Sequence, residues 1–328
     1  MNSEKISPWT IRKVGKQFCN LHGNYIPSWR DVARWKLGLE PRELVADPAL
    51  CKACEPALVA PDFATLSQPD PSRIVATWVG HATFLLQIGG HQFLTDPHFG
   101  SYCAPLPLAR YRRQTPPGLE ISQLPLTDVI LLSHNHYDHL DHGSLRALAP
   151  GKDIYCPLGV GRSLRGVGAQ KVVELAWGES AWVGEVRLVC MPAQHGSGRT
   201  PFDRNRSLWC GWMIEHGDQR AFFAGDTGYS PLFREIGNYF GSINLAMLPI
   251  GAYRPSWFMR PLHADPAEAV QMHLDLRAKQ SVAMHWGAFL LADEPLGEPA
   301  LLLRQARAAA GVSAEAFRLL GLGETLVV

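Results

Sequence analysis

The chain has 328 residues, of which 46% are hydrophobic and 19% are charged, and its formal net charge is +1. This length supports a large core in one big domain or two small ones, and the balanced charge gives no general attraction to nucleic acid. No apolar run of about 18 residues occurs, and residues 1–10 lack the apolar core of a signal peptide, so we expect neither a transmembrane helix nor a signal peptide.

The cysteines argue for a reducing compartment. There are seven, an odd number, and they are scattered along the chain, which does not suit a disulfide scaffold. Cys51 and Cys54 have the spacing of half a zinc knuckle or of a redox pair. No second C-x-x-C motif completes a knuckle, and no βαβ pattern surrounds the pair, so we assign it no function. We expect a cytoplasmic protein.

Residues 1–70 differ from the rest of the chain in being rich in proline and tryptophan and poor in alternating pattern. We interpret them as an N-terminal arm that precedes a main domain of residues 71–328. Residues 28–39 predict a short basic helix with Trp29, Val32, Trp35 and Leu39 on one face. Such a helix can lie on a membrane surface or pack on the main domain, and the sequence leaves both open.

From residue 73 the pattern becomes regular. Residues 74–79, 83–88 and 92–95 read as consecutive strands, with Gly89-Gly90 as a hairpin signal between the last two. Asp96 follows the third strand, where we expect it to orient a metal-binding histidine by a hydrogen bond. His81 lies in the turn between the first two strands. It could also orient a metal-binding histidine, or it could simply be a turn residue, and the sequence leaves both open. Residues 110–113 form a basic cluster that suits either an anionic group or plain solvation.

The most informative stretch begins with the apolar run of residues 128–132, which reads as a buried strand. Directly after it come His134, His136, Asp138 and His139 in the spacing H-x-H-x-D-H. Alternate side chains of an extended segment point the same way, so the first two histidines can bind one ion. Asp138 and His139 follow a turn and can reach a second ion. Imidazole nitrogen and carboxylate oxygen suit zinc.

Further strands are predicted over residues 153–156, 171–175, 181–183, 186–190, 208–215, 220–224, 245–250 and 281–284, with helices over 144–148, 231–240, 266–278 and 300–310 and a final strand over 324–328. Three of these strands are followed within a few residues by a histidine or an aspartate. We expect His195 to complete the first ion's ligands, Asp226 to bridge both ions and His285 to bind the second ion.

An aromatic loop with Tyr253, Trp257 and Phe258 comes before His263 and the next helix. Such a loop suits an acyl pocket or simple core packing. Asp265, Pro266 and Glu268 form a helix-start signal, and a histidine just before a helix N-terminus can contact a substrate phosphate or donate a proton.

Together these motifs resemble the metallo-β-lactamase superfamily, and within it the N-acylphosphatidylethanolamine-hydrolysing phospholipase D family. The resemblance spans residues 74 to about 290, and it is carried by the following segments: 78–83, 94–97, 133–141, 222–229, 249–253, 257–259, 265–270 and 285–287. It implies an α/β fold, the metallo-β-lactamase αββα sandwich, as a single catalytic domain preceded by the arm.

The family's site residues carry over one by one. The resemblance implies that His134, His136 and His195 bind the first zinc and that Asp138, His139 and His285 bind the second, with Asp226 as the bridge. It assigns Asp138, Asp226 and His263 to catalysis, His263 near the substrate phosphate. It also implies two zinc ions, although other divalent metals suit the same ligands.

The resulting functional hypothesis is a zinc-dependent phosphodiesterase of the phospholipase D type, which hydrolyses N-acylphosphatidylethanolamine to N-acylethanolamine and phosphatidic acid. The expected partners are a phospholipid substrate, a membrane surface and a second copy of the chain, with no nucleic acid. Two alternatives are a metal-dependent lactonase acting on a sugar-phosphate lactone and a membrane-surface binding protein with a vestigial metal site.

Overall fold

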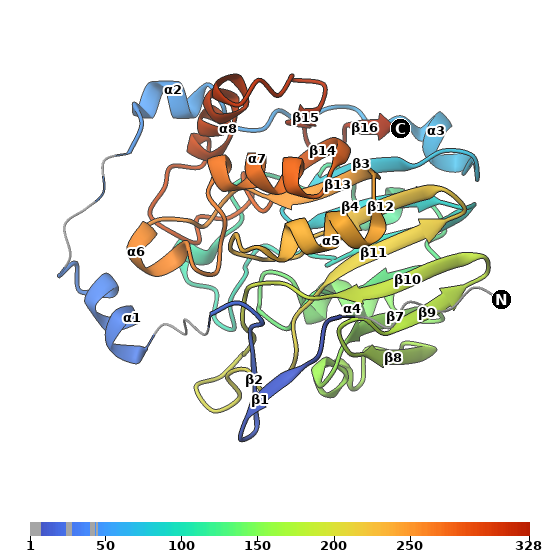
Figure 1. Cartoon of the computed structure of the whole chain (residues 1–328), viewed down its shortest axis with the longest axis horizontal. Helices are drawn as coiled ribbons and strands as arrows, with labels where there is room; N and C mark the ends of the chain where they lie inside the picture. The colour runs from blue at the N-terminus through green and yellow to red at the C-terminus, as the bar shows by residue number, and fades with distance from the viewer. Residues whose placement is uncertain (1–7, 24–27, 40–42, 44) are drawn as a thin grey trace.

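The computed structural model describes residues 8–23, 28–39, 43 and 45–328. Two seven-stranded sheets pack face to face, and helices cover their outer faces (Figure 1). The structure therefore has the expected αββα architecture.

The first sheet has the strand order β16-β3-β4-β5-β6-β7-β8. Its strands, in chain order, are β3 (Val75–Gly80), β4 (Thr83–Ile88), β5 (His91–Thr95), β6 (Val129–Leu131), β7 (Asp153–Pro157), β8 (Lys171–Leu175) and β16 (Thr325–Val327). β5 to β8 run parallel, whereas β16, β3, β4 and β5 are antiparallel neighbours. β16 lies at the edge, beside β3.

The second sheet has the strand order β15-β14-β13-β12-β11-β10-β9. Its strands are β9 (Ser180–Val183), β10 (Val186–Met191), β11 (Gly211–His216), β12 (Gln219–Phe223), β13 (Ile243–Pro249), β14 (Ala278–Met284) and β15 (Phe317–Arg318). The helices α5 (Leu232–Phe240), α7 (Pro266–Asp275) and α8 (Glu298–Ala309) lie over its outer face in Figure 1. α6 (Ser256–Met259) precedes α7, and α4 (His142–Leu148) packs on the first sheet.

The core lies mainly between the two sheets, because alternate side chains of each strand point to the inner face. Trp78 and Phe84 of the first sheet belong to the same buried cluster as Trp212 and Phe222 of the second. The opposite faces of β4 and β6 form a second cluster with α4. The all-buried strands thus read as apolar runs in the sequence because both of their faces are covered.

Among the described residues, the arm contains a hairpin of β1 (Arg12–Val14) and β2 (Gln17–Cys19), then α1 (Trp29–Lys36), α2 (Pro48–Lys52) and α3 (Phe63–Ser67). α1 confirms the helix predicted there, and Ser28 caps it through a reciprocal pair of bonds with Asp31. The other arm elements were not predicted, because each is too short to show a period. Short 3₁₀ turns occupy η1 (Ala109–Tyr111), η2 (Ile121–Gln123) and η3 (Val160–Leu164).

Four predicted boundaries were wrong by three residues, namely the starts of β11 and β14 and the ends of α1 and α7, and the other boundaries that differ do so by one or two residues. β11 begins at Gly211 and not at residue 208, because the amides of Leu208 and Cys210 instead donate to Leu158 and Ser133 of the first half of the chain. α7 ends at Asp275, since Arg277 adopts a left-handed conformation with φ 54°, and β14 starts directly afterwards. In the part of the chain that the structure describes, no helix has the length and apolar character needed to cross a membrane.

Candidate metal centre

The histidine-rich segment leaves the end of β6 and lies where loops from both sheets meet. His134 Nε2 lies 2.8 Å from His136 Nδ1, and His195 Nε2, from the loop after β10, lies 3.2 Å from the same atom. The three nitrogens form one group whose members all lie within 4.8 Å of one another. The structure therefore brings together the three residues predicted for the first ion.

The residues predicted for the second ion form an adjacent group. Asp138 Oδ2 lies 3.2 Å from His139 Nε2 and 3.3 Å from His285 Nε2, which follows β14. Asp226 follows β12, and its Oδ2 lies 3.1 Å from the same nitrogen of both histidines. That oxygen also lies 3.9 Å from His134 Nε2 and 3.7 Å from His195 Nε2, so Asp226 stands between the two groups.

The chemistry of these residues fits divalent cations. Asp226 Oδ1 is fully buried and has no hydrogen-bond partner. Buried polar atoms normally find a partner, and a cation between the imidazoles and carboxylates would supply one. A set of imidazole nitrogens and carboxylate oxygens suits zinc and several other divalent ions.

The electrostatics of the centre also favour a cation. Burial opposes ionisation of Asp226, but the neighbouring His139 and His285 outweigh it and hold the pKa of its carboxyl well below the usual range. The pKa of His285 is raised to about 9, because the Asp226 and Asp138 carboxylates overcome the effect of burial. The buried Asp226 and the partly buried Asp138 thus require positive charge beside them, from protons or from metal ions.

Asp96 supports the centre as expected. Its Oδ2 lies 2.7 Å from His139 Nδ1, the ring nitrogen that faces away from the ligand group. Ser133 donates its amide to Asp96 Oδ1 at 2.7 Å and its hydroxyl to Oδ2 at 2.5 Å. A carboxylate that holds the second nitrogen of a ligand histidine fixes its tautomer and its orientation.

Asn20 is a supporting residue that sequence reasoning missed. Its side-chain amide donates to the His195 carbonyl at 2.9 Å and accepts from the His195 amide at 3.0 Å. The Trp209 indole also donates to Asn20 Oδ1 at 3.1 Å. The only sequence signal was a polar residue beside the apolar Phe18 and Cys19, which does not identify a partner 175 residues away.

His263 borders the centre, and its ring lies close enough to His195 and Asp226 to form a further group with them. Its Nδ1 lies 3.9 Å from Asp226 Oδ2 and has no hydrogen-bond partner. Its ring stands edge-on to that of His195, with ring centroids 4.9 Å apart. Burial lowers the pKa of His263 well below its usual value, so the ring is neutral.

The basic cluster at residues 110–113 does not stay together. Arg110 and Arg112 are exposed, whereas Arg113 turns inward, donates to the Gly100 and His98 carbonyls and stacks on Phe289. Only the exposed pair remains available to an anionic group.

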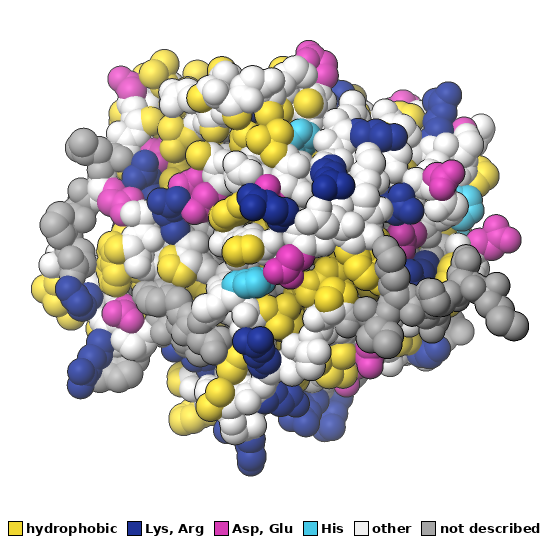
Figure 2. Space-filling view, viewed as in Figure 1, with side chains coloured by type: hydrophobic (Ala, Val, Ile, Leu, Met, Phe, Trp, Pro, Cys, Tyr) yellow, Lys and Arg dark blue, Asp and Glu magenta, His cyan; other side chains and the backbone are white. Residues whose placement is uncertain are grey.

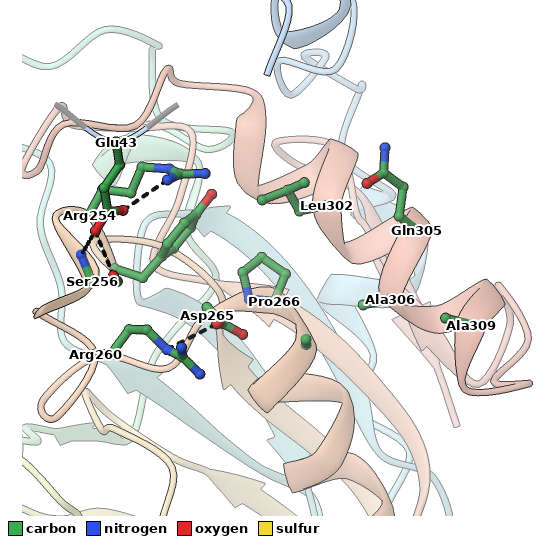
Figure 3. A pocket seen from close by; sticks show the side chains of 12 residues that line it. Glu43, Arg254, Ser256, Arg260, Asp265, Pro266, Leu302, Gln305, Ala306 and Ala309 are labelled. Atoms are coloured by element: carbon green, nitrogen blue, oxygen red, sulfur yellow. Dashed lines mark hydrogen bonds and ion pairs between the residues drawn. The ribbon is translucent and has the colours of Figure 1, made fainter. Parts of the chain in front are cut away.

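A cavity of about 470 Å³ contains none of the predicted ligands (Figure 3). It lies between α8, the start of α7 and the segment after β13. Arg254 pairs there with Glu298 at 2.6 Å and with Glu43 at 2.9 Å, and Glu43 accepts from Ser256. These charged groups pair with one another, and the bonds to Glu43 attach this part of the arm to the rest of the structure. We therefore take the metal centre, and not this cavity, as the candidate site.

Comparison with known proteins agrees with this geometry. Residues 91–286 match the family profile described as Beta-lactamase superfamily domain. An uncharacterised protein of Mycobacterium tuberculosis is 41% identical over 303 residues, which cover 88% of this chain and 80% of that protein. The N-acyl-phosphatidylethanolamine-hydrolyzing phospholipase D 1 of Caenorhabditis elegans is 38% identical over 231 residues, 66% of this chain and 65% of that enzyme.

The fold has also been seen in solved structures. An isothiocyanate hydrolase from Delia radicum gut bacteria aligns with a TM-score of 0.64 at 21% identity, covering 77% of this chain and 98% of that one. This likeness concerns the fold alone. With the family match and the clustered ligands, it shows that the chain belongs to the β-lactamase superfamily, as a metal-dependent hydrolase of the metallo-β-lactamase fold that is similar to the N-acylphosphatidylethanolamine-hydrolysing phospholipases D.

Proposed function

We propose that this protein is a two-zinc phosphodiesterase of the phospholipase D type, which hydrolyses N-acylphosphatidylethanolamine to N-acylethanolamine and phosphatidic acid. The observation that carries the proposal is the position of Asp226, whose Oδ2 faces nitrogens of both histidine groups. A carboxylate in this place is suited to bridge two ions. The nematode relative, whose name states the proposed reaction, supports the choice of substrate.

Two divalent ions held by these residues would supply an activated water and neutralise charge on the phosphoryl oxygens. The chain's own residues would set the geometry. Asp226 would keep the two ligand groups at a fixed separation, and Asp138 would offer its carboxylate to the second ion. Both carboxylates stay ionised, because their histidine neighbours hold their pKa values well below the usual range.

His263 would bind the substrate phosphate. Since burial lowers the pKa of this histidine, its ring is neutral, and we assign it to donating a hydrogen bond to a phosphate oxygen. A substrate anion beside the ring would raise that pKa and thereby allow His263 to pass a proton to the leaving alcohol.

The substrate would bind beside Tyr137, which stands between two ligand residues in the sequence. A cavity of about 350 Å³ lies there, lined by Tyr102, Pro105, Tyr137, Leu140, Arg199 and neighbouring residues, and it too contains none of the seven ligands. The Arg199 guanidinium stacks on the Tyr137 ring at 3.9 Å and donates to the Leu140 carbonyl. This mixture of aromatic rings and one cation suits a lipid with an anionic headgroup.

We propose a cytoplasmic enzyme that meets its substrate on a membrane surface. Lysines and arginines gather at the lower edge of the molecule in Figure 2, around the β1–β2 hairpin, where Arg12, Lys13 and Lys16 are exposed beside Val14. Phe202, which is 83% exposed, lies on the loop that the hairpin contacts through Gln17 and Arg204. Basic and apolar side chains together are typical of surfaces that bind anionic lipid.

The deciding experiment assays purified protein for metal content and for hydrolysis of N-acylphosphatidylethanolamine in mixed micelles, with the products identified by mass. We expect two metal ions per chain and release of N-acylethanolamine, both lost in Asp226→Asn. Two ions without release, but with hydrolysis of a sugar-phosphate lactone, would replace the proposal by the lactonase alternative. Two ions with no hydrolysis of any ester would favour a binding protein. Light scattering of the same sample tests the expected homodimer.

A further inference from the structure

We propose that His81 is a positioning residue of the metal centre, whose Nε2–H donates a hydrogen bond to the Asp138 carboxylate and holds it toward the second ion. The proposal rests on the two-ion centre proposed above. It concerns a residue outside the seven ligands, in the turn between β3 and β4.

The side chain of His81 is in place to do this. Its Nε2 lies 3.0 Å from Asp138 Oδ2, and the residue is only 1% exposed. Its Nδ1 is buried and has no hydrogen-bond partner. A neutral imidazole carries a single N–H, and placing it on Nδ1 would bury an unpaired donor and turn a lone pair toward a carboxylate. The proton therefore belongs on Nε2, where it meets Asp138.

The main chain of His81 holds a second ligand residue. Its carbonyl accepts from the His285 amide at 3.0 Å and from the Trp78 indole at 3.0 Å. The rings of His81 and His285 lie with centroids 4.2 Å apart, and the edge of Phe289 closes the other side at 5.2 Å. His81 thus contacts Asp138 and His285. Its ring centroid also lies 5.3 Å from that of His139, so its contacts fall on all three of these second-ion ligands.

The backbone shows that this arrangement is constrained. His81 adopts φ 53° and His285 adopts φ 59°, a left-handed conformation that is unfavourable for both residues. Such conformations persist where the surroundings fix them and often occur at functional sites. The hydrogen bond from the Trp78 indole to the His81 carbonyl is one of the contacts that fix it here.

Two variants separate the side chain from the backbone. Asparagine tolerates the left-handed conformation, but its amide is too short to reach Asp138, so His81→Asn removes the donor and keeps the turn. The longer amide of His81→Gln can place an N–H near the position of Nε2. His273→Gln is the matched control, because His273 is a buried histidine on α7 whose ring bonds the Ser281 hydroxyl, away from the metal centre.

The experiment titrates metal-free protein with Zn²⁺ in competition with a chromophoric chelator, with circular dichroism and thermal melting as checks of folding. We expect wild type to bind two equivalents of Zn²⁺, and His273→Gln to bind both with the same affinities as wild type. For His81→Asn we expect the first equivalent to bind normally and the second to bind about 10–100-fold more weakly, with His81→Gln recovering most of the loss. The first ion is an internal control, since a misfolded variant would lose both.

Three results would contradict the proposal. Unchanged binding of both ions in His81→Asn would remove the positioning role but leave the two-ion centre intact. A wild type that binds a single ion would instead refute that centre. Failure of His81→Gln to recover binding, with one nitrogen fewer around the metal by X-ray absorption, would make His81 a direct ligand.

Discussion

At the scale of single residues, a variant of His263 can separate the chemistry of the centre from metal binding. Its Nδ1 lies 3.9 Å from Asp226 Oδ2, the same distance as His134 Nε2, so the substrate role proposed for it has to be tested against a ligand role. We expect His263→Gln to keep both ions and to lower kcat for N-acylphosphatidylethanolamine about 100-fold, because a hydrogen bond to the phosphate is lost in the transition state.

The measurement pairs steady-state kinetics with metal analysis of the same preparation. Wild-type turnover in His263→Gln would remove the phosphate-binding role, whereas a loss of metal would turn His263 into a ligand. His142 is a suitable control, because it lies just beyond the ligand loop and bonds the Ser163 carbonyl.

The residues of the centre were largely predictable because their spacing is local. Four of them occupy six consecutive positions after one apolar strand, and His195, Asp226 and His285 each follow a strand of their own. Asn20 was not predictable, because its role depends on how a hairpin of the arm docks on a loop of the second sheet. That docking is a tertiary contact between segments with no shared pattern.

At the scale of elements, the β1–β2 hairpin braces the loop that carries His195. Asn20 bonds both backbone groups of His195, and the Phe18 amide donates to the Asn205 carbonyl at 2.8 Å. We expect Asn20→Ala to weaken binding of the first ion by about tenfold or more and to leave the second less affected, because the loop loses both bonds.

Asn20→Asp provides a graded comparison. Its carboxylate can still accept from the His195 amide and the Trp209 indole, but it cannot donate to the His195 carbonyl. Zinc titration of the three proteins should therefore place Asn20→Asp between wild type and Asn20→Ala. Equal affinities in all three would show that the hairpin does not contribute to the metal centre.

The connection between β14 and α8 holds a carboxyl group with an unusual proton affinity. Glu294 is buried, accepts from the backbone amides of Ala252 and Arg254, and has its pKa raised to about 7 by burial. The folded state therefore binds this proton more tightly than the unfolded state. The protonated Glu294 therefore stabilises the folded state fully below about pH 4.5. This stabilisation, at most about 3 kcal/mol of the free energy of unfolding, is lost as the pH rises to about 7.

Glu294→Gln should abolish this dependence. In metal-free protein, the free energy of unfolding of the variant relative to wild type should rise between pH 5 and pH 8, as urea titrations at several pH values would show. The amide also loses one acceptor, but that penalty does not change with pH. A difference in the free energy of unfolding that does not change with pH would mean that Glu294 has the same pKa in the folded and unfolded states.

Elements with a clear period were predictable, and short ones were not. The strands β3, β4 and β6 follow their apolar runs closely because the residues on both of their faces are buried. α2 and α3 have five residues each, too few to establish a helical period, and they depend on the Asp47 and Asp62 caps and on packing.

At the scale of the whole molecule, the metal centre joins the two sheets. Its ligands come from the ends of β6, β10, β12 and β14, so ions bound there connect both halves of the sandwich. Ligands that bind only the folded state stabilise it, by about 4 kcal/mol at 1,000 times Kd. We expect chelation by EDTA to lower the Tm of wild type by several degrees.

Asp226→Asn is the control for this measurement, because it should begin with a low Tm that EDTA does not change. Restoring Zn²⁺ should raise the Tm of wild type only. A wild-type Tm that is indifferent to both treatments would mean that metal is not coupled to folding.

The pairing of β16 with β3 has a consequence for synthesis on the ribosome. Thr325 lies opposite Thr77, so about 250 residues of chain separate the two partners. During translation the outer edge of β3 therefore stays unpaired while the rest of both sheets emerges. An open, apolar strand edge invites pairing with other nascent chains. Newly made molecules should accordingly depend on chaperones far more than refolding of the finished, dilute protein does.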